Sequence, residues 1–313
     1  MRRFFRPVTI ALQSAEWPTW GLLLAVYGGW GVVISHWAQL GTGLGSALLI
    51  VWICWYLSLQ HELVHGHPTR SARLNRLLGL APLAVWYPFD LYRDSHLAHH
   101  RDEHLTSPGI DPESNYLTAE HFARLPRLLQ AGWRCQRTVL GRLLVGPALV
   151  LPPTWAGMLR QPLHGDHTYN LDWATHLVLL AAMLWALWYF AGIHPLLYLL
   201  LAYAALGLAM LRSLYEHRPA TRPAHRIAVN EASAFWRLLY LNNNYHMVHH
   251  ESPGLPWYRL RQTYLADRQG YLQRNGGFLL PGYGYLLRRF ALQPIDAPVL
   301  PADLLPVYPA HQG

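Results

Sequence analysis

The sequence predicts an all-α integral membrane protein, in which four transmembrane helices form two hairpins and a helical cap on one side of the membrane holds metal ions. Two observations support this fold class. Of the 313 residues, 52% are hydrophobic and only 13% are charged, and the apolar residues occur in blocks that are long enough to cross a bilayer. Nine of the 19 histidines lie in three short clusters, all of which fall outside these blocks.

A membrane-spanning helix needs about 20 mostly apolar residues, and four stretches of the chain meet this requirement. They cover roughly residues 18–36, 42–60, 174–192 and 195–213. Tryptophans lie near the ends of these stretches, where an aromatic belt at the membrane interface would place them: Trp17, Trp20, Trp37, Trp173 and Trp188. The short connections within each pair of stretches predict two helical hairpins.

Two further apolar stretches do not fit a transmembrane helix. Residues 77–89 are too few to cross, and residues 143–159 are flanked by Arg142 and Arg160 and interrupted by prolines. We interpret both as interfacial or re-entrant segments. If residues 143–159 did cross the membrane, the third histidine cluster would lie on the side opposite to the first two clusters.

The distribution of arginine predicts which side of the membrane holds the clusters. All 25 basic residues are arginines, and none falls between Arg6 and Arg70 or between Arg160 and Arg212. Because arginine near the membrane marks the cytoplasmic side, we expect both termini and all three clusters to be cytoplasmic. The net charge of +8 then reflects topology and attraction to anionic lipid. The sequence contains no compact basic module, so we expect no nucleic-acid partner.

The histidine clusters have the spacing of metal ligands. The first contains His-x-x-x-His, and the second and third share His-x-x-His-His; residues three or four apart lie on one face of a helix. The candidate ligands are His61 and His65, then His96, His99 and His100, then His246, His249 and His250. Neutral imidazole binds iron, zinc, copper and nickel, and eight convergent imidazoles are too many for one ion. We therefore predict a site for two metal ions.

In this arrangement the chain resembles the membrane fatty-acid desaturase superfamily of histidine-box di-iron enzymes, which includes desaturases, hydroxylases and ketolases. The resemblance covers residues 18–262 and rests on the three boxes and on their positions relative to the apolar hairpins. It implies a desaturase-like domain over residues 1–262, a cytoplasmic extension over residues 263–313 and a di-iron site in the cytoplasmic cap. It also implies that His217, which follows the fourth apolar stretch, is a ninth ligand.

The resemblance further implies an oxygen-dependent membrane oxidoreductase with two non-haem iron ions and O2 as co-substrate. A fatty-acyl desaturase is the first expectation, and lipid hydroxylation and carotenoid ketolation or hydroxylation are alternatives on the same scaffold. The sequence contains no dinucleotide-binding loop, Cys-rich iron–sulfur motif or fused haem signature. We therefore expect an external electron donor, which is a ferredoxin-like or haem carrier with its reductase. The absence of lysine fits a GC-rich bacterial genome and hence a bacterial inner membrane.

Polar residues beside the clusters are candidates for hydrogen bonds that orient the ligand imidazoles. They are Glu62, Asp90, Asp94, Asn242, Asn243 and Asn244. A different interpretation exists for the first cluster, because residues 61–65 also match the His-Glu-x-x-His motif of zinc proteases, in which Glu62 would be the general base. That interpretation leaves the other two clusters without a role.

Overall fold

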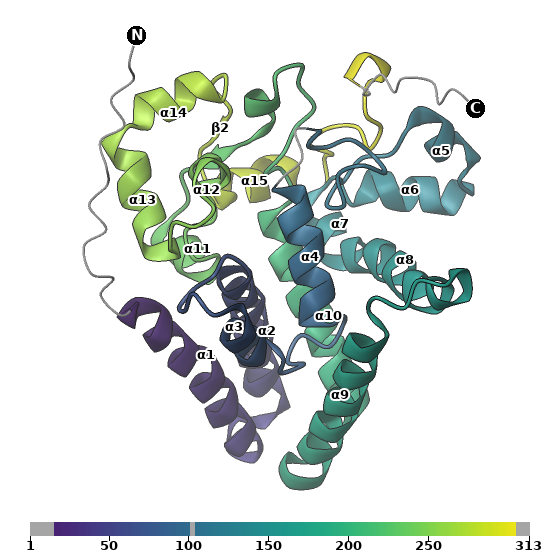
Figure 1. The fold of residues 1–313 in the computed structure, drawn as a ribbon, viewed down its shortest axis with the longest axis vertical. Helices are drawn as coiled ribbons and strands as arrows, with labels where there is room; N and C mark the ends of the chain where they lie inside the picture. The colour runs from purple at the N-terminus through teal and green to yellow at the C-terminus, as the bar shows by residue number, and fades with distance from the viewer. Residues whose placement is uncertain (1–15, 101–103, 305–313) are drawn as a thin grey trace.

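The computed structural model describes residues 16–100 and 104–304 and shows a layer of long helices below a broader cap of short helices (Figure 1). The long helices form two pairs. The first pair is α1 (Trp17–Ser35) and α2 (Trp37–Val64), and the second is α9 (Asn170–Ala191) and α10 (Pro195–Arg212). α2 packs against α10, and this contact joins the two pairs. The arginine-rich N-terminal segment and residues 305–313 lie outside the described residues.

The bounds of these four helices agree with the sequence prediction to within a few residues. The largest apparent difference is the early start of α2, which includes Gly41 with a non-helical φ of 71° and ψ of 164°. Glycine suits this positive φ because it has no Cβ to obstruct it. The regular helix therefore begins after Gly41, as predicted, and continues to the first histidine cluster.

Five helical stretches in the described part of the chain are long and apolar enough to cross a membrane. Four are the predicted ones, and the fifth is Val139–His164, where α7 (Val139–Leu144) continues into α8 (Gly146–Arg160). In Figure 1, α8 runs across the direction of α9 and α10 and not alongside them. Such an orientation is compatible with an interfacial segment.

The cap consists of short helices and one small β-element. Its remaining helices are α3 (Ala72–Gly79), α4 (Phe89–His99), α5 (Ala119–Arg124), α6 (Arg127–Cys135), α11 (Ala234–Leu239), α12 (His246–Glu251), α13 (Trp257–Ala266), α14 (Arg268–Arg274) and α15 (Tyr283–Phe290), with single 3-10 turns at Pro162–His164, Pro223–Arg226 and Ala302–Leu304. Contrary to the all-α prediction, β1 (Val229–Asn230) pairs in parallel with β2 (Leu279–Leu280). Strands of two residues are too short to produce the alternating pattern by which a strand is predicted.

The predicted C-terminal extension packs into the cap. Tyr264 donates a hydrogen bond of 2.7 Å to Glu231, and Asp296 forms an ion pair with the buried Arg137. Asp296 also accepts a hydrogen bond of 2.6 Å from Tyr116. The described part of the extension is therefore continuous with the rest of the cap.

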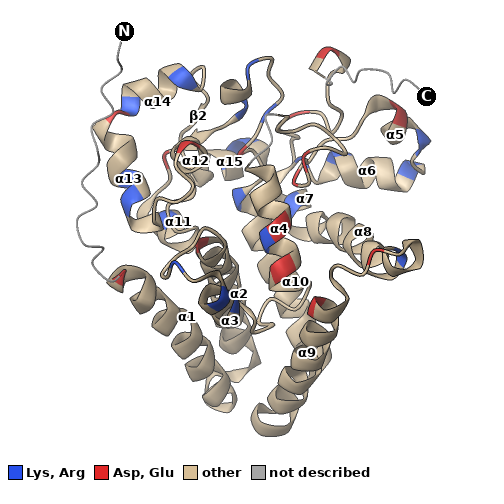
Figure 2. Ribbon diagram, in the orientation of Figure 1, with Lys and Arg blue, Asp and Glu red and all other residues tan. Residues whose placement is uncertain are grey.

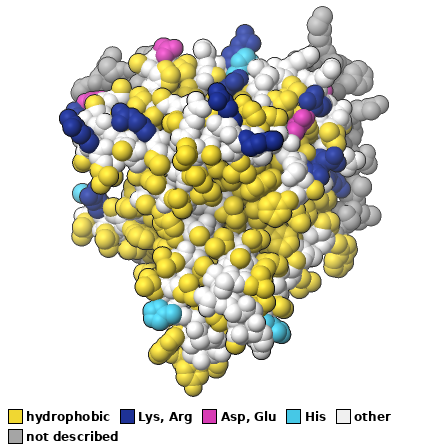
Figure 3. All heavy atoms as spheres, turned by 180° about the vertical axis from the view of Figure 1, so that it is seen from behind, with side chains coloured by type: hydrophobic (Ala, Val, Ile, Leu, Met, Phe, Trp, Pro, Cys, Tyr) yellow, Lys and Arg dark blue, Asp and Glu magenta, His cyan; other side chains and the backbone are white. Residues whose placement is uncertain are grey.

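The surface divides into an apolar region and a charged region. Figure 2 shows most charged residues in the cap and at the upper ends of the long helices. Figure 3 shows hydrophobic side chains covering the middle and lower part of the opposite face, with the arginines above them. Large apolar residues of α9 are exposed, among them Trp185, Tyr189 and Phe190. Soluble monomers rarely expose a contiguous apolar surface of this extent, whereas lipid would cover it.

Candidate metal centre

The ends of four helices meet in the cap and bring the predicted histidines together. α2 ends in the first cluster, α4 carries the second, α12 carries the third, and His217 follows α10. The nine histidines fall into two adjacent groups. The five-histidine group contains His61, His65, His96, His100 and His249, and the four-histidine group contains His99, His217, His246 and His250. Within each group, one nitrogen atom of every residue lies within 4.8 Å of the others.

Consecutive histidines belong to different groups. His99 and His100 point in different directions at the end of α4, because neighbouring residues on a helix differ by about 100°. His249 and His250 of α12 are divided between the groups in the same way. The rings of His100 and His250 stack with their centroids 4.4 Å apart, so the two groups lie side by side.

The distances between nitrogen atoms fit the ligands of a metal ion. In the five-histidine group, Nε2 of His65 lies 2.9 Å from Nε2 of His96. In the four-histidine group, Nε2 of His246 lies 3.0 Å from Nε2 of His217. Two nitrogens that bind one ion at about 2.1 Å and at right angles are about 3.0 Å apart. The nitrogens of both groups therefore have the spacing of a coordination sphere.

Metal binding requires neutral imidazoles, and the environment provides them. Burial, together with neighbouring imidazoles of α4, lowers the pKa of His100 to about 3. Burial and the nearby His99 lower the pKa of His217 to about 3 as well. His99 differs, because burial lowers its pKa but the Glu113 and Asp111 carboxylates outweigh that effect and raise it. His100 and His217 are thus neutral at physiological pH.

Two carboxylates that the sequence analysis did not identify orient the second cluster. Glu113 Oε1 lies 2.8 Å from His96 Nδ1, and Asp111 Oδ1 lies 2.8 Å from His99 Nδ1. Asp111 is itself held by the backbone N–H groups of Thr106 and Glu113. A carboxylate that accepts the Nδ1 proton fixes the ring and leaves Nε2 free for a metal. The sequence signal was a pair of acids shortly after the second cluster, in a loop without any periodic pattern.

Among the three asparagines before the third cluster, Asn243 contacts the histidines. Its Nδ2 lies 3.2 Å from His61 Nε2 and its Oδ1 lies 3.3 Å from His246 Nδ1, so it bridges the two groups. Asn242 and Asn244 differ from the prediction, because their amides donate to backbone carbonyl groups. These two side chains hold the loop before α12 in place.

Asp90 and Asp94, which we predicted to orient ligand histidines, pair with arginines instead. Asp90 forms ion pairs with Arg76 at 2.7 Å and with Arg93 at 2.6 Å, and Asp94 pairs with Arg93 at 2.8 Å. The reason is the helix geometry of α4. Asp90 and Asp94 precede His96 by six and two residues, which places them about 240° and about 200° away from it around the axis. They therefore lie on the face of α4 that points away from the histidines.

Glu62 is buried beside the first cluster, but its carboxylate is bound elsewhere. Oε2 accepts a hydrogen bond of 3.0 Å from the backbone N–H of Trp257, and Oε1 lies 3.8 Å from His61 Nδ1. A general base in a zinc protease must reach a metal-bound water. Here the carboxylate anchors the start of α13, and five imidazoles surround the site where a protease would present two. This arrangement does not favour the protease interpretation.

A comparison with known families extends these observations to most of the chain. The profile of the family described as fatty acid desaturase matches residues 35–279, a range that includes all nine histidines. The chain belongs to the fatty acid desaturase family. No match to this desaturase-family chain is found among curated proteins. Family membership and the apolar helices make it an integral membrane oxidoreductase, and its histidine boxes form groups that can bind metal.

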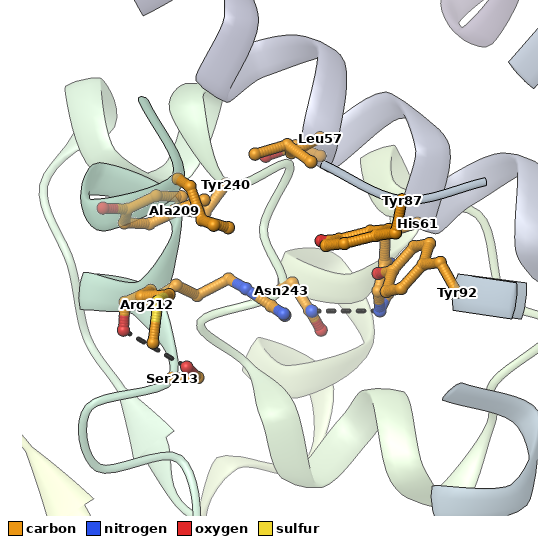
Figure 4. A pocket seen from close by; sticks show the side chains of 12 residues that line it. Leu57, His61, Tyr87, Tyr92, Ala209, Arg212, Ser213, Tyr240 and Asn243 are labelled. Atoms are coloured by element: carbon orange, nitrogen blue, oxygen red, sulfur yellow. Dashed lines mark hydrogen bonds between the residues drawn. The ribbon is translucent and has the colours of Figure 1, made fainter. Parts of the chain in front are cut away.

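This desaturase-family protein has two adjoining cavities beside the histidines. The larger has a volume of about 430 Å³, lies along α4, α8 and α10 and reaches His217 of the four-histidine group. The smaller has a volume of about 120 Å³ and reaches His61 of the five-histidine group (Figure 4). A substrate in these cavities would lie next to both groups.

Proposed function

We propose that this desaturase-family protein uses two non-haem iron ions and O2 to introduce a carbon–carbon double bond into a fatty acyl chain. The observation that supports this proposal is the pair of adjacent imidazole groups whose nitrogens lie at the spacing of metal ligands. Bound iron would supply the activation of O2 that protein side chains lack. In the overall reaction two hydrogens leave the acyl chain, O2 becomes two waters, and a donor supplies two electrons, with two protons from solvent.

The residues of the chain have separate tasks in this proposal. The imidazoles of the boxes hold the ions, and the consecutive histidine pairs hold the two groups beside each other. Asp111 and Glu113 accept ring N–H groups and so keep Nε2 of His99 and His96 directed at the centre. The burial of His246 and His249 in the third box limits the access of water to this side of the centre.

We further propose that four helices cross a bacterial inner membrane in two hairpins, with the active site and both termini in the cytoplasm. The segment Val139–His164 lies between the second and third boxes, so a crossing by this segment would place α4 and α12 on opposite sides. The contact between these two helices at the histidines supports an interfacial α8. The arginine-free connections of both hairpins support the cytoplasmic orientation.

Metal content and lipid analysis test this function together. We expect detergent-purified protein to contain about two iron ions per chain and no Soret band of haem. We also expect an expressing host to accumulate unsaturated acyl chains that are missing from a host expressing His96→Ala. If hydroxylated lipid or oxidised carotenoid accumulated in place of the alkene, the proposed desaturation would be wrong, whereas the proposed metal centre would stand. One zinc ion and no iron, after expression with added iron, would contradict the proposal.

Exposed arginines of the cap suggest an acidic electron carrier. Arg70, Arg73, Arg259 and Arg261 are all exposed. Because opposite charges accelerate encounter, we expect turnover driven by a ferredoxin-like or haem carrier and its reductase to fall as the ionic strength rises above about 0.15 M. Turnover driven by a small uncharged reductant is the control. Equal salt dependence of both reactions would exclude electrostatic steering of the carrier.

A further inference from the structure

The two cavities beside the histidines share a polar wall. The residues that line both are Tyr87, Tyr92, Leu206, Met210, Arg212 and Ser213. A cavity that holds only hydrocarbon needs no charged or hydrogen-bonding side chain. The presence of a guanidinium group and two phenol groups on the wall that the two cavities share therefore needs a chemical explanation.

Arg212 is the last residue of α10, and its guanidinium points into the smaller cavity (Figure 4). Its Nη1 atom is buried and has no hydrogen-bond partner among residues 16–100 and 104–304. The nearest acid is Glu216, whose Oε1 lies 3.3 Å from Nη1 and is itself without a hydrogen bond in that part of the chain. Glu216 balances the charge of Arg212, but a buried donor without a hydrogen bond is unfavourable until a ligand supplies an acceptor.

Two phenol groups face Arg212 across the cavity. Figure 4 shows the hydroxyl groups of Tyr87 and Tyr92 pointing toward the space that the guanidinium enters from the other side. The structure gives neither hydroxyl a hydrogen bond to any residue that it describes. The amide of Asn243, at the inner end of this space, already contacts His61. Nη1 of Arg212 and the hydroxyl groups of Tyr87 and Tyr92 are therefore left to donate hydrogen bonds to a ligand, while Glu216 supplies an acceptor beside them.

We propose that Arg212 binds the carboxylate of a free carboxylic acid inside this cavity, so that the acid is oxidised near its carboxyl end. This inference rests on the proposed oxidation of an acyl chain and specifies its substrate class. The planar fork of arginine matches the two oxygens of a carboxylate, and the hydrogen bonds are charge-assisted. Tyr87 and Tyr92 can each add a donor. An ester or thioester presents one neutral carbonyl oxygen and uses fewer of these donors.

The binding of a matched acid and ester to the iron-loaded protein tests the inference. Decanoic acid and its methyl ester are titrated by calorimetry in the same detergent, into the wild type and into Arg212→Gln. We expect the wild type to prefer the acid by at least about tenfold and Arg212→Gln to lose this preference. Partition of the acid and the ester into micelles is the same for the wild type and for Arg212→Gln. The quantity compared is therefore the ratio of acid affinity to ester affinity in each protein. An unchanged ratio in Arg212→Gln would overturn the inference.

Two further variants and one control separate loss of binding from loss of folding. The double variant Arg212→Gln with Glu216→Gln removes both members of the buried pair and so keeps the charge balanced; it too should lose the preference for the acid. Tyr92→Phe removes one donor and should weaken acid binding severalfold more than ester binding. Arg268→Gln, which removes an exposed arginine of α14, should retain the full preference of the wild type.

The outcomes distinguish this inference from the proposed function. If the protein contains iron and oxidises lipid but binds acid and ester equally, the proposed function stands and the carboxylate site is excluded. If the protein binds the acid through Arg212 but neither retains iron nor oxidises lipid, the carboxylate site stands and the proposed function is excluded.

Discussion

His249→Ala is expected to abolish lipid oxidation and to lower the iron content of the purified protein. His249 is fully buried, its Nε2 lies 2.9 Å from Nε2 of His100, and its ring contacts those of His61 and His65. Alanine removes a ligand from the five-histidine group and leaves no side chain that can replace it. Iron per chain, measured by elemental analysis, and acyl products, measured by gas chromatography with mass spectrometry, check this expectation.

His164→Ala is the matched control for that substitution. His164 is exposed in the 3-10 turn before α9, and it belongs to neither histidine group. We expect this variant to keep the iron and the activity of the wild type. Normal product formation by His249→Ala would show that the five-histidine group is not the reacting centre.

Asp111→Asn is expected to weaken iron binding by about 10–100-fold, the usual effect of removing a hydrogen-bond partner of a metal-bound histidine. Asp111 is buried, accepts backbone hydrogen bonds and lies 2.8 Å from His99 Nδ1. Asparagine has nearly the same shape, but its neutral oxygen holds the ring N–H less strongly, and its amide can oppose the required tautomer. Competition with a chelator measures the iron affinity directly.

The exposed Asp166→Asn provides the control for charge removal without contact to a histidine. It should leave the iron affinity unchanged. If Asp111→Asn also retained wild-type affinity, the carboxylate would have no part in orienting His99, and the contact would serve only to shape the loop.

The sequence was sufficient to predict the long helices and the convergence of the histidines, because both depend on regular periodicity. Apolar runs of membrane length define α1, α2, α9 and α10 within a few residues. The His-x-x-His-His spacing places its three imidazoles at the end of one short helix. The assignment of His217 as a ligand depended on the family resemblance and on its position after the fourth apolar stretch. In the structure its Nε2 atom lies 3.2 Å from Nε2 of His99.

The parts that were missed depend on contacts between residues that are distant in sequence or on loops. Asp111 and Glu113 reach the histidines because an irregular loop folds back over α4, and no periodic pattern describes such a loop. The failure at Asp90 has another cause, since the angular positions on α4 already exclude contact with His96 and His99. Proximity in sequence to a cluster was therefore a weaker guide than direction around the helix.

The division of each consecutive histidine pair between the two groups has a consequence for how the centre is assembled. An ion bound in the five-histidine group would hold the backbone of α4 and α12, and this same backbone presents His99 and His250 to the four-histidine group. A second ion would then order less of the chain when it binds, and we expect loading to be cooperative. Half-loaded protein would then be scarce. This matters in a cell that contains oxygen, because a lone redox ion can pass single electrons to O2 and release superoxide.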